Sequence, residues 1–150
     1  MFGSVKLDIT GYFSMLNKKL VISPSLSSRI LIGEVSYPYM NFYGGEYAGR
    51  YFDNQMSFIG INHPQLAGNS IAITKLYLRG EIADKHYIRA AVNYGTTAND
   101  FVNLFKYNQN LWGTSLGYAY ESLVGPITLD LYWSNVTKRV GAFFNIGYFF

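Results

Sequence analysis

Apolar and polar residues alternate at every second position along most of this chain. The alternation is clearest in residues 127–150, where two alternating runs flank a short polar stretch at residues 135–139. A period of two suits a β-strand whose two faces meet different surroundings, and it does not suit an α-helix. The pattern therefore predicts a closing β-hairpin. One face of this hairpin carries Ile127, Leu129, Leu131, Trp133, Val140, Ala142, Phe144, Ile146, Tyr148 and Phe150.

Similar runs recur upstream, separated by turns and loops. With the hairpin they make eight, at about residues 3–15, 20–35, 50–62, 70–82, 87–94, 111–121, 127–134 and 140–150. A strand needs about 9–11 residues to cross a bilayer at a tilt, and only a closed barrel lets apolar strand faces point into lipid. The pattern predicts an all-β chain, a transmembrane antiparallel β-barrel with eight strands and one domain, residues 1–150.

The links between the runs differ in length. Residues 83–85 and 123–126 form short turns, whereas residues 96–110 form a long loop. Bacterial barrels have short periplasmic turns and longer external loops. The Gly-rich and aromatic loop at residues 36–49 falls on the periplasmic side by this count, although it is long. We expect either that it folds into the lumen or that the strand count changes by one near Arg50. Pro24 predicts a kink or bulge in the second run, because proline cannot donate to a ladder.

Composition agrees with strands rather than helices. Aromatic residues make up 18% of the chain and charged residues only 14%, and no window approaches the 18 consecutive apolar residues of a spanning helix. A scattered net charge of +3 does not indicate nucleic acid, and the lack of cysteine excludes disulfides. There is no signal peptide, so we expect a mature or trimmed form.

The charged residues of the runs lie opposite the apolar faces. If the apolar faces meet lipid, the charges converge in the interior, which in an eight-stranded barrel is only wide enough for side chains. We therefore predict ion pairing inside the barrel, and we place Trp112, Trp133, Tyr148 and Phe150 at the membrane interface. The interior charges are Lys6, Asp8, Arg29, Lys75, Arg79, Glu81, Arg89, Glu121 and Asp130.

Candidate chemistry is sparse. The two histidines, His63 and His86, flank the run at residues 70–82, which separates them by about 40 Å along a strand. They are not expected to share a site, and we predict no catalytic residue, no metal and no cofactor. Two alternatives stay open: a membrane-embedded, lipid-modifying enzyme, and a soluble β-barrel that binds an apolar ligand.

Several stretches resemble a known family. The closing pattern at residues 125–150 resembles the last hairpin of the barrel domain of BamA-type outer-membrane assembly and secretion proteins. Upstream, residues 42–60 and 87–95 resemble the barrel attached to patatin-like phospholipases of Bacteroidetes-type bacteria, and the likeness extends over about residues 41–150. It implies a non-catalytic barrel with a structural or transport-related role in the outer membrane of a Gram-negative bacterium, of the surface antigen type.

The resemblance also implies a lumen contact. In the family, a long loop carrying Arg-Gly-Phe or Arg-Gly-Tyr enters the lumen, and its arginine pairs with an acidic residue of the wall. Arg50 is the matching position, although Gly precedes it and Tyr follows it directly. Its expected partner is Glu81, Glu121 or Asp130, with Arg79 and Arg89 as further members of the interior ion-pair set.

The resemblance leaves the architecture open. Family barrels have sixteen strands, preceded by POTRA or patatin domains that this chain lacks. We expect a short, POTRA-less form that closes as eight strands and dimerises through its apolar wall, in contact with outer-membrane lipid and other outer-membrane proteins. The alternative is half of a sixteen-stranded barrel, since open edges are not tolerated in lipid.

Overall fold

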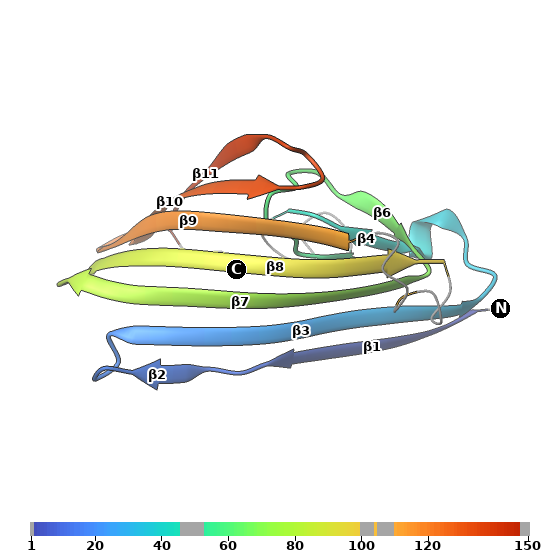
Figure 1. The fold of residues 1–150 in the computed structure, drawn as a ribbon, viewed down its shortest axis with the longest axis horizontal. Coiled ribbons are helices and arrows are strands. Elements are labelled where there is room, and N and C mark those ends of the chain that lie inside the picture. Colours follow the sequence, from blue (N-terminus) through green and yellow to red (C-terminus); the bar gives the residue numbers. More distant parts are fainter. Residues whose placement is uncertain (1, 46–52, 100–103, 105–109, 148–150) are drawn as a thin grey trace.

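The computed structural model describes residues 2–45, 53–99, 104 and 110–147. These residues form a large antiparallel sheet of eight strands and a small sheet of three (Figure 1). A 3₁₀ turn is formed by Tyr37–Tyr39, and no helix among the described residues is long and apolar enough to cross a membrane. The large sheet contains β1 (Phe2–Thr10), β2 (Phe13–Met15), β3 (Leu20–Gly33), β7 (Ser70–Ala83), β8 (His86–Ala98), β9 (Asn110–Ser122), β10 (Gly125–Ser134) and β11 (Val140–Ile146).

Hydrogen bonding across the large sheet follows the path β1-β3-β7-β8-β9-β10-β11, with β2 also paired to β3. β1 and β2 follow one another along β3, and they are separated at Gly11 and Tyr12. This break lies at Pro24 of β3, whose carbonyl accepts a hydrogen bond from the Gly11 amide at 2.9 Å. The irregularity expected at Pro24 is therefore present, but it interrupts the partner strand rather than β3.

The predicted count of eight strands is confirmed, but the strands are not the predicted eight. The expected run at residues 50–62 does not cross the sheet. Among its described residues, 53–62, only Gln55–Met56 (β5) forms a strand, and that strand belongs to the small sheet. The error has a physical cause: the apolar residues Met56, Phe58, Ile59 and Ile61 are all at most 4% exposed, so they are buried in protein instead of facing lipid on alternate positions.

The missing crossing changes the position of the loop at residues 36–49. The ends of β3 and β8 and the starts of β7 and β9 meet at one edge of the sheet, which we call the loop edge. Residues 16–19, 84–85 and 123–124 connect strands at the opposite edge, the turn edge. The expected alternative, a strand count that changes by one, therefore holds, because the chain leaves the sheet after β3 and re-enters it at β7, both at the loop edge. The parity that placed residues 36–49 on the side of the short turns no longer applies.

We call residues 34–69 the inserted segment, and its described residues, 34–45 and 53–69, fold back over one face of the large sheet (Figure 1). The segment carries the small sheet, in the order β5-β4-β6, with β4 at Asn41–Tyr43 and β6 at Gln65–Gly68. The expectation that this loop folds inward holds for its described residues. Its apolar side chains and those of the wall form one core cluster: Tyr43, Met56, Phe58, Ile61, Ala67, Ile71, Ile73 and Leu111.

The two faces of the large sheet have the predicted chemistry. The face under the inserted segment, called the inner face, buries polar residues such as Asn93, Thr128, Asp130 and Ser134. The outer face is apolar and exposed, as the alternation predicts. Its exposed residues include Val5, Leu7, Ile9, Ile32, Leu76, Ile82, Ile88, Val92, Trp112, Leu116, Leu129, Leu131, Phe144 and Ile146.

The first and last strands of the path run in the same direction. Each step from β1 to β11 is an antiparallel pairing, and there are six such steps. An even number of reversals restores the starting direction, so β1 and β11 both run from the loop edge toward the turn edge. No pairing between β1 and β11 is present among the described residues.

Candidate functional site

The inner face of β7 to β11 brings most of the predicted interior charges together in rows. Each row takes one residue from each strand, because the antiparallel registers place these residues side by side. The row that holds most of the charge consists of Arg79, Arg89, Gly117, Asp130 and Phe143. The next row toward the turn edge consists of Glu81, Tyr87, Ala119, Thr128 and Asn145.

Arg89 and Asp130 form an ion pair inside the protein. Nη1 of Arg89 lies 3.3 Å from Oδ2 of Asp130, and their side chains are 17% and 3% exposed. Asp130 Oδ2 and Arg89 Nε make no aligned hydrogen bond among the described residues, so the contact is mainly one of charge. The guanidinium also lies 5.6 Å from the centroid of the Tyr77 ring.

Gly117 makes this ion pair possible. It lies on β9, in register with Arg89 on one side and Asp130 on the other. A Cβ atom at Gly117 would overlap Oδ1 of Asp130. The missing side chain thus leaves the space in which the two charges reach across the intervening strand.

The remaining interior candidates make other contacts. Arg79 lies over the ring of Tyr87, 5.0 Å from its centroid, and the Tyr87 hydroxyl donates to Oε2 of Glu121 at 3.3 Å. Glu81 lies in register with Tyr87. Arg79 and Glu121 therefore meet at one tyrosine rather than at each other. The walls of a pocket of about 390 Å³ at the turn edge include Arg79, Tyr87, Arg89, Glu121 and Thr128.

The other predicted interior charges are bound by the inserted segment or by each other. Lys75 Nζ donates to Ser57 Oγ at 2.8 Å, and Arg29 Nη1 donates to Asn41 Oδ1 at 3.3 Å. Lys6 and Asp8 form an exposed pair on β1 at 3.0 Å. Arg50, the residue that the family resemblance singled out, lies outside the described residues, and so do Tyr148 and Phe150. The partner of Arg50 stays a prediction.

The inserted segment touches the wall most closely at Ile59 and Gly60. Gly60 has a φ of +89°, and its carbonyl oxygen accepts hydrogen bonds from Ser134 Oγ at 2.9 Å and from Thr137 Oγ1 at 3.1 Å. A Cβ atom at Gly60 would lie 2.7 Å from Cβ of Ser134, and one at Gly113 would overlap the carbonyl oxygen of Ile59. Two glycines, one from each side, thus let the two backbones approach.

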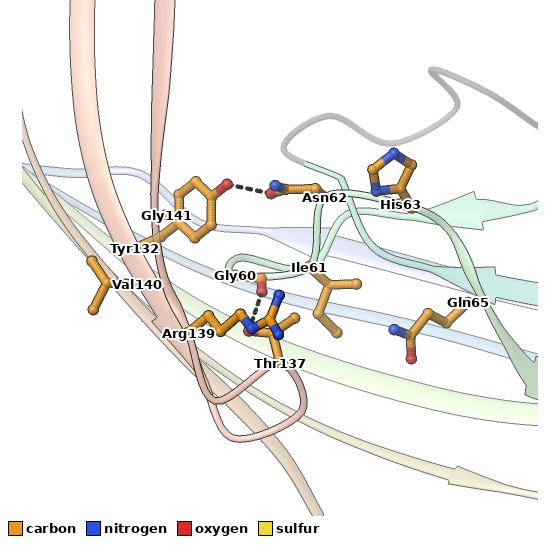
Figure 2. A pocket seen from close by; sticks show the side chains of 10 residues that line it. All are labelled: Gly60, Ile61, Asn62, His63, Gln65, Tyr132, Thr137, Arg139, Val140 and Gly141. Atoms are coloured by element: carbon orange, nitrogen blue, oxygen red, sulfur yellow. Dashed lines mark hydrogen bonds between the residues drawn. The ribbon is translucent and has the colours of Figure 1, made fainter.

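Further hydrogen bonds connect the inserted segment to the wall and connect parts of the segment to each other. The Tyr132 hydroxyl donates to Oδ1 of Asn62 (Figure 2). Within the segment, Tyr43 donates to Oε1 of Gln65 at 3.2 Å, and burial raises the pKa of the Tyr43 phenol, so this donor stays protonated. Sequence reasoning missed these contacts. The one sequence feature that could have indicated a close approach of two backbones is the presence of glycine at positions 60 and 113, next to apolar residues.

The family is decided by comparison with known proteins. A family model of the OMP85 superfamily matches residues 1–150. The chain belongs to the OMP85 superfamily. This membership confirms the predicted kinship with BamA-type barrels and relates the chain to outer-membrane assembly and translocation proteins. The likeness to patatin-associated barrels is not part of this match and stays a prediction. No curated protein matches the chain.

The outer face of this OMP85 chain carries aromatic residues toward both edges. Near the loop edge, the rings of Trp112 and Trp133 lie 4.7 Å apart. Toward the turn edge, His86 bonds to the Tyr118 hydroxyl and lies 4.9 Å from the ring centroid of Tyr120. Trp112 and Tyr120 are eight residues apart on β9, or about 27 Å along the strand. At a strand tilt of about 35–45° this spacing is about 19–22 Å along the membrane normal, a few ångströms less than the apolar band of about 25 Å between the aromatic girdles of outer-membrane barrels.

The two histidines of the OMP85 chain belong to different parts of the fold, His63 to the inserted segment and His86 to β8. His63 lines a pocket of about 480 Å³ between the inserted segment and the β10–β11 hairpin, together with Tyr132 and Arg139 (Figure 2). His86 lies on the outer face at the start of β8. The described residues contain no group of three or more His, Asp or Glu side chains that would hold a metal ion.

Proposed function

We propose that this chain forms part of the wall of a barrel in the bacterial outer membrane, with the inserted segment filling the interior. Its role in this proposal is structural or related to transport, and it involves no catalysis. OMP85 membership supports the membrane setting. The observation that carries the proposal is the close contact of Ile59 and Gly60 with Gly113 and Ser134 on the inner face.

Burial and polarity both favour an occupied interior. Phe58 is 0% exposed and Ile59 is 3% exposed, so removing the segment from the wall would expose large apolar side chains. Full burial of such a side chain contributes about 1.5–3 kcal/mol. The inserted segment is therefore a stable part of the interior, and passage of a large solute requires its displacement.

A substitution of one glycine tests this function. In Gly113→Val, the new side chain collides with the Ile59 carbonyl and should displace the inserted segment. The matched control is Gly80→Val, because no atom lies within 4 Å of a Cβ at Gly80. The natural protein would carry each change in its own outer membrane, and uptake of a bulky hydrophilic antibiotic would be measured.

We expect several-fold faster uptake with Gly113→Val and unchanged uptake with Gly80→Val. Protease cleavage within residues 53–69 would report displacement of the segment independently. Unchanged uptake at normal protein abundance, in a Gly113→Val protein that the protease does cleave there, would contradict the proposal.

A further inference from the structure

We propose that the pocket between the inserted segment and the β10–β11 hairpin binds a hexose-sized organic anion. The carboxylate or phosphate group of this ligand pairs with Arg139, and its other oxygen atoms accept hydrogen bonds from the side-chain amides of Asn62 and Gln65. The volume of the pocket is about 480 Å³, and small-molecule sites usually measure about 300–1,000 Å³. The site goes beyond the barrel-wall role given above, and it rests on that role in one respect, because the inserted segment must be in place to form it.

The charge in the lining of the pocket is positive. Arg139 belongs to the loop between β10 and β11, and its side chain extends from the hairpin toward the inserted segment (Figure 2). Among the described residues, no Asp or Glu lines the pocket, and Arg139 takes part in neither of the ion pairs found there. The planar guanidinium carries five N–H donors in a geometry that matches a carboxylate or a phosphate. The lining therefore favours an anion.

Two tyrosine hydroxyls determine which atom of each amide is left for a ligand. Tyr132 donates to Oδ1 of Asn62, and Tyr43 donates to Oε1 of Gln65 at 3.2 Å. Because a tyrosine already binds the oxygen of each amide, the NH₂ groups are the atoms left to contact a ligand, and an NH₂ group can only donate. In Figure 2 the amide nitrogen of Gln65 is directed toward the hairpin. The two amides and the guanidinium thus all present donors to the pocket.

The walls of the pocket are held in place by contacts within the protein. The Gly60 carbonyl accepts hydrogen bonds from two hydroxyls, one at the end of β10 and one in the hairpin loop. The next carbonyl, that of Ile61, accepts from the Gly45 amide, and Gln65 pairs with β4 through the small sheet. A preformed site loses less conformational entropy when a ligand binds. The donors are therefore positioned before the anion arrives.

The position of the pocket indicates a ligand that comes from water. The hairpin loop, residues 135–139, lies at the loop edge, because Ser134 pairs with Gly113 near the start of β9. The pocket is on the inner face, and Asn62, His63 and Gln65 of its rim are exposed. The lipid of the proposed barrel contacts the opposite, outer face of the wall. The occupant is therefore a water-soluble anion and not a lipid headgroup.

Calorimetric titration of the natural protein in detergent micelles tests the site. The probes are glucuronate, glucose 6-phosphate and glucose, which share a hexose ring and differ in the charged group. We expect at least one of the two anions to bind about ten-fold more tightly than glucose, the usual effect of one charge-assisted hydrogen bond. The tighter of the two anions shows whether a carboxylate or a phosphate is preferred. Equal affinity for all three probes, or no binding of either anion at about 10 mM, would overturn the proposal.

Substitutions place the bound anion in this pocket. Arg139→Gln should weaken binding of the tighter anion about ten-fold. The matched control is Lys138→Gln, which removes the neighbouring exposed charge of the same loop from outside the lining. Gln65→Glu keeps an acceptor for Tyr43 but replaces the NH₂ donor with a negative charge, so it should abolish binding. Equal affinities of Arg139→Gln and Lys138→Gln, or normal binding by Gln65→Glu, would overturn the proposal.

Protease resistance separates the failure of this site from the failure of the proposed function. Resistance of residues 53–69 shows that the inserted segment is in place in the natural protein and in each variant used for titration. A protein whose segment is in place but which binds neither anion would overturn the site and leave the occupied interior intact. Unchanged uptake with Gly113→Val, in a protein that is cleaved within residues 53–69, would instead overturn the role of the interior and leave the anion site intact.

Discussion

Arg89 and Asp130 lie on strands that are not neighbours, and they meet across Gly117 of the strand between them. Their charged atoms, Nη1 and Oδ2, are 3.3 Å apart. The carboxylate occupies the space that a side chain at position 117 would fill. One glycine therefore connects β8, β9 and β10 through a buried charge contact, directly on the inner face of the wall.

The first prediction concerns Gly117. Gly117→Ala places a Cβ against the Asp130 carboxylate and forces it away from Arg89. We expect a loss of about 1–3 kcal/mol in the free energy of unfolding, the usual cost of overpacking. Urea titration of the natural protein in lipid vesicles measures it, with Gly80→Ala as the matched control. Equal stability of the two variants would show that the ion pair does not depend on the glycine.

The second prediction distinguishes the interaction energy of Arg89 and Asp130 from the effect of removing each side chain alone. Asp130→Ala leaves the Arg89 charge buried without its partner, and we expect a loss of about 3 kcal/mol. Arg89→Ala combined with Asp130→Ala should be less unstable than the sum of the two single variants, because the second change removes the orphaned charge. Additive losses in this double-mutant cycle would mean that the two side chains do not interact.

The alternation of side chains was enough to predict the two faces of the sheet. Val5, Leu129 and Phe144 point outward and Asp130 points inward, because a period of two fixes the side of every residue once one is known. The same reasoning wrongly predicted a membrane-crossing strand at residues 50–62. The apolar residues of this run are buried in a protein core instead of facing lipid. A short apolar run has the same sequence pattern in a protein core and in a lipid-facing strand.

The contacts of the interior needed the register of several strands at once. Arg89 and Asp130 are 41 residues apart in sequence, and only the combined pairings of β8, β9 and β10 place them in one row. Both residues were predicted as interior charges, but no pattern in the sequence selects this pair from the others. The contact between Gly60 and Ser134 was missed for the same reason.

The third prediction concerns the contact of the Gly60 carbonyl with Ser134 and Thr137. Ser134→Ala removes one of the two hydroxyl donors to the Gly60 carbonyl, and Thr137 retains the other. We expect a loss of about 1 kcal/mol in the free energy of unfolding and faster amide hydrogen exchange in residues 57–62. Adding Thr137→Val should enlarge both effects. Ser14→Ala on exposed β2 is the control, and exchange that does not differ between Ser14→Ala and the double variant would contradict the contact.

The fourth prediction fixes the depth of the loop edge in the membrane. The chain has two tryptophans, so Trp112→Phe and Trp133→Phe each leave a single fluorophore. Because both rings lie on the outer face near the loop edge, and tryptophan concentrates at the level of the headgroups, each remaining ring should be quenched more strongly by bromine near the headgroup than by bromine at the acyl chain end. The reverse order would place the loop edge in the middle of the bilayer. The two tryptophans would then not belong to an aromatic girdle at the membrane interface.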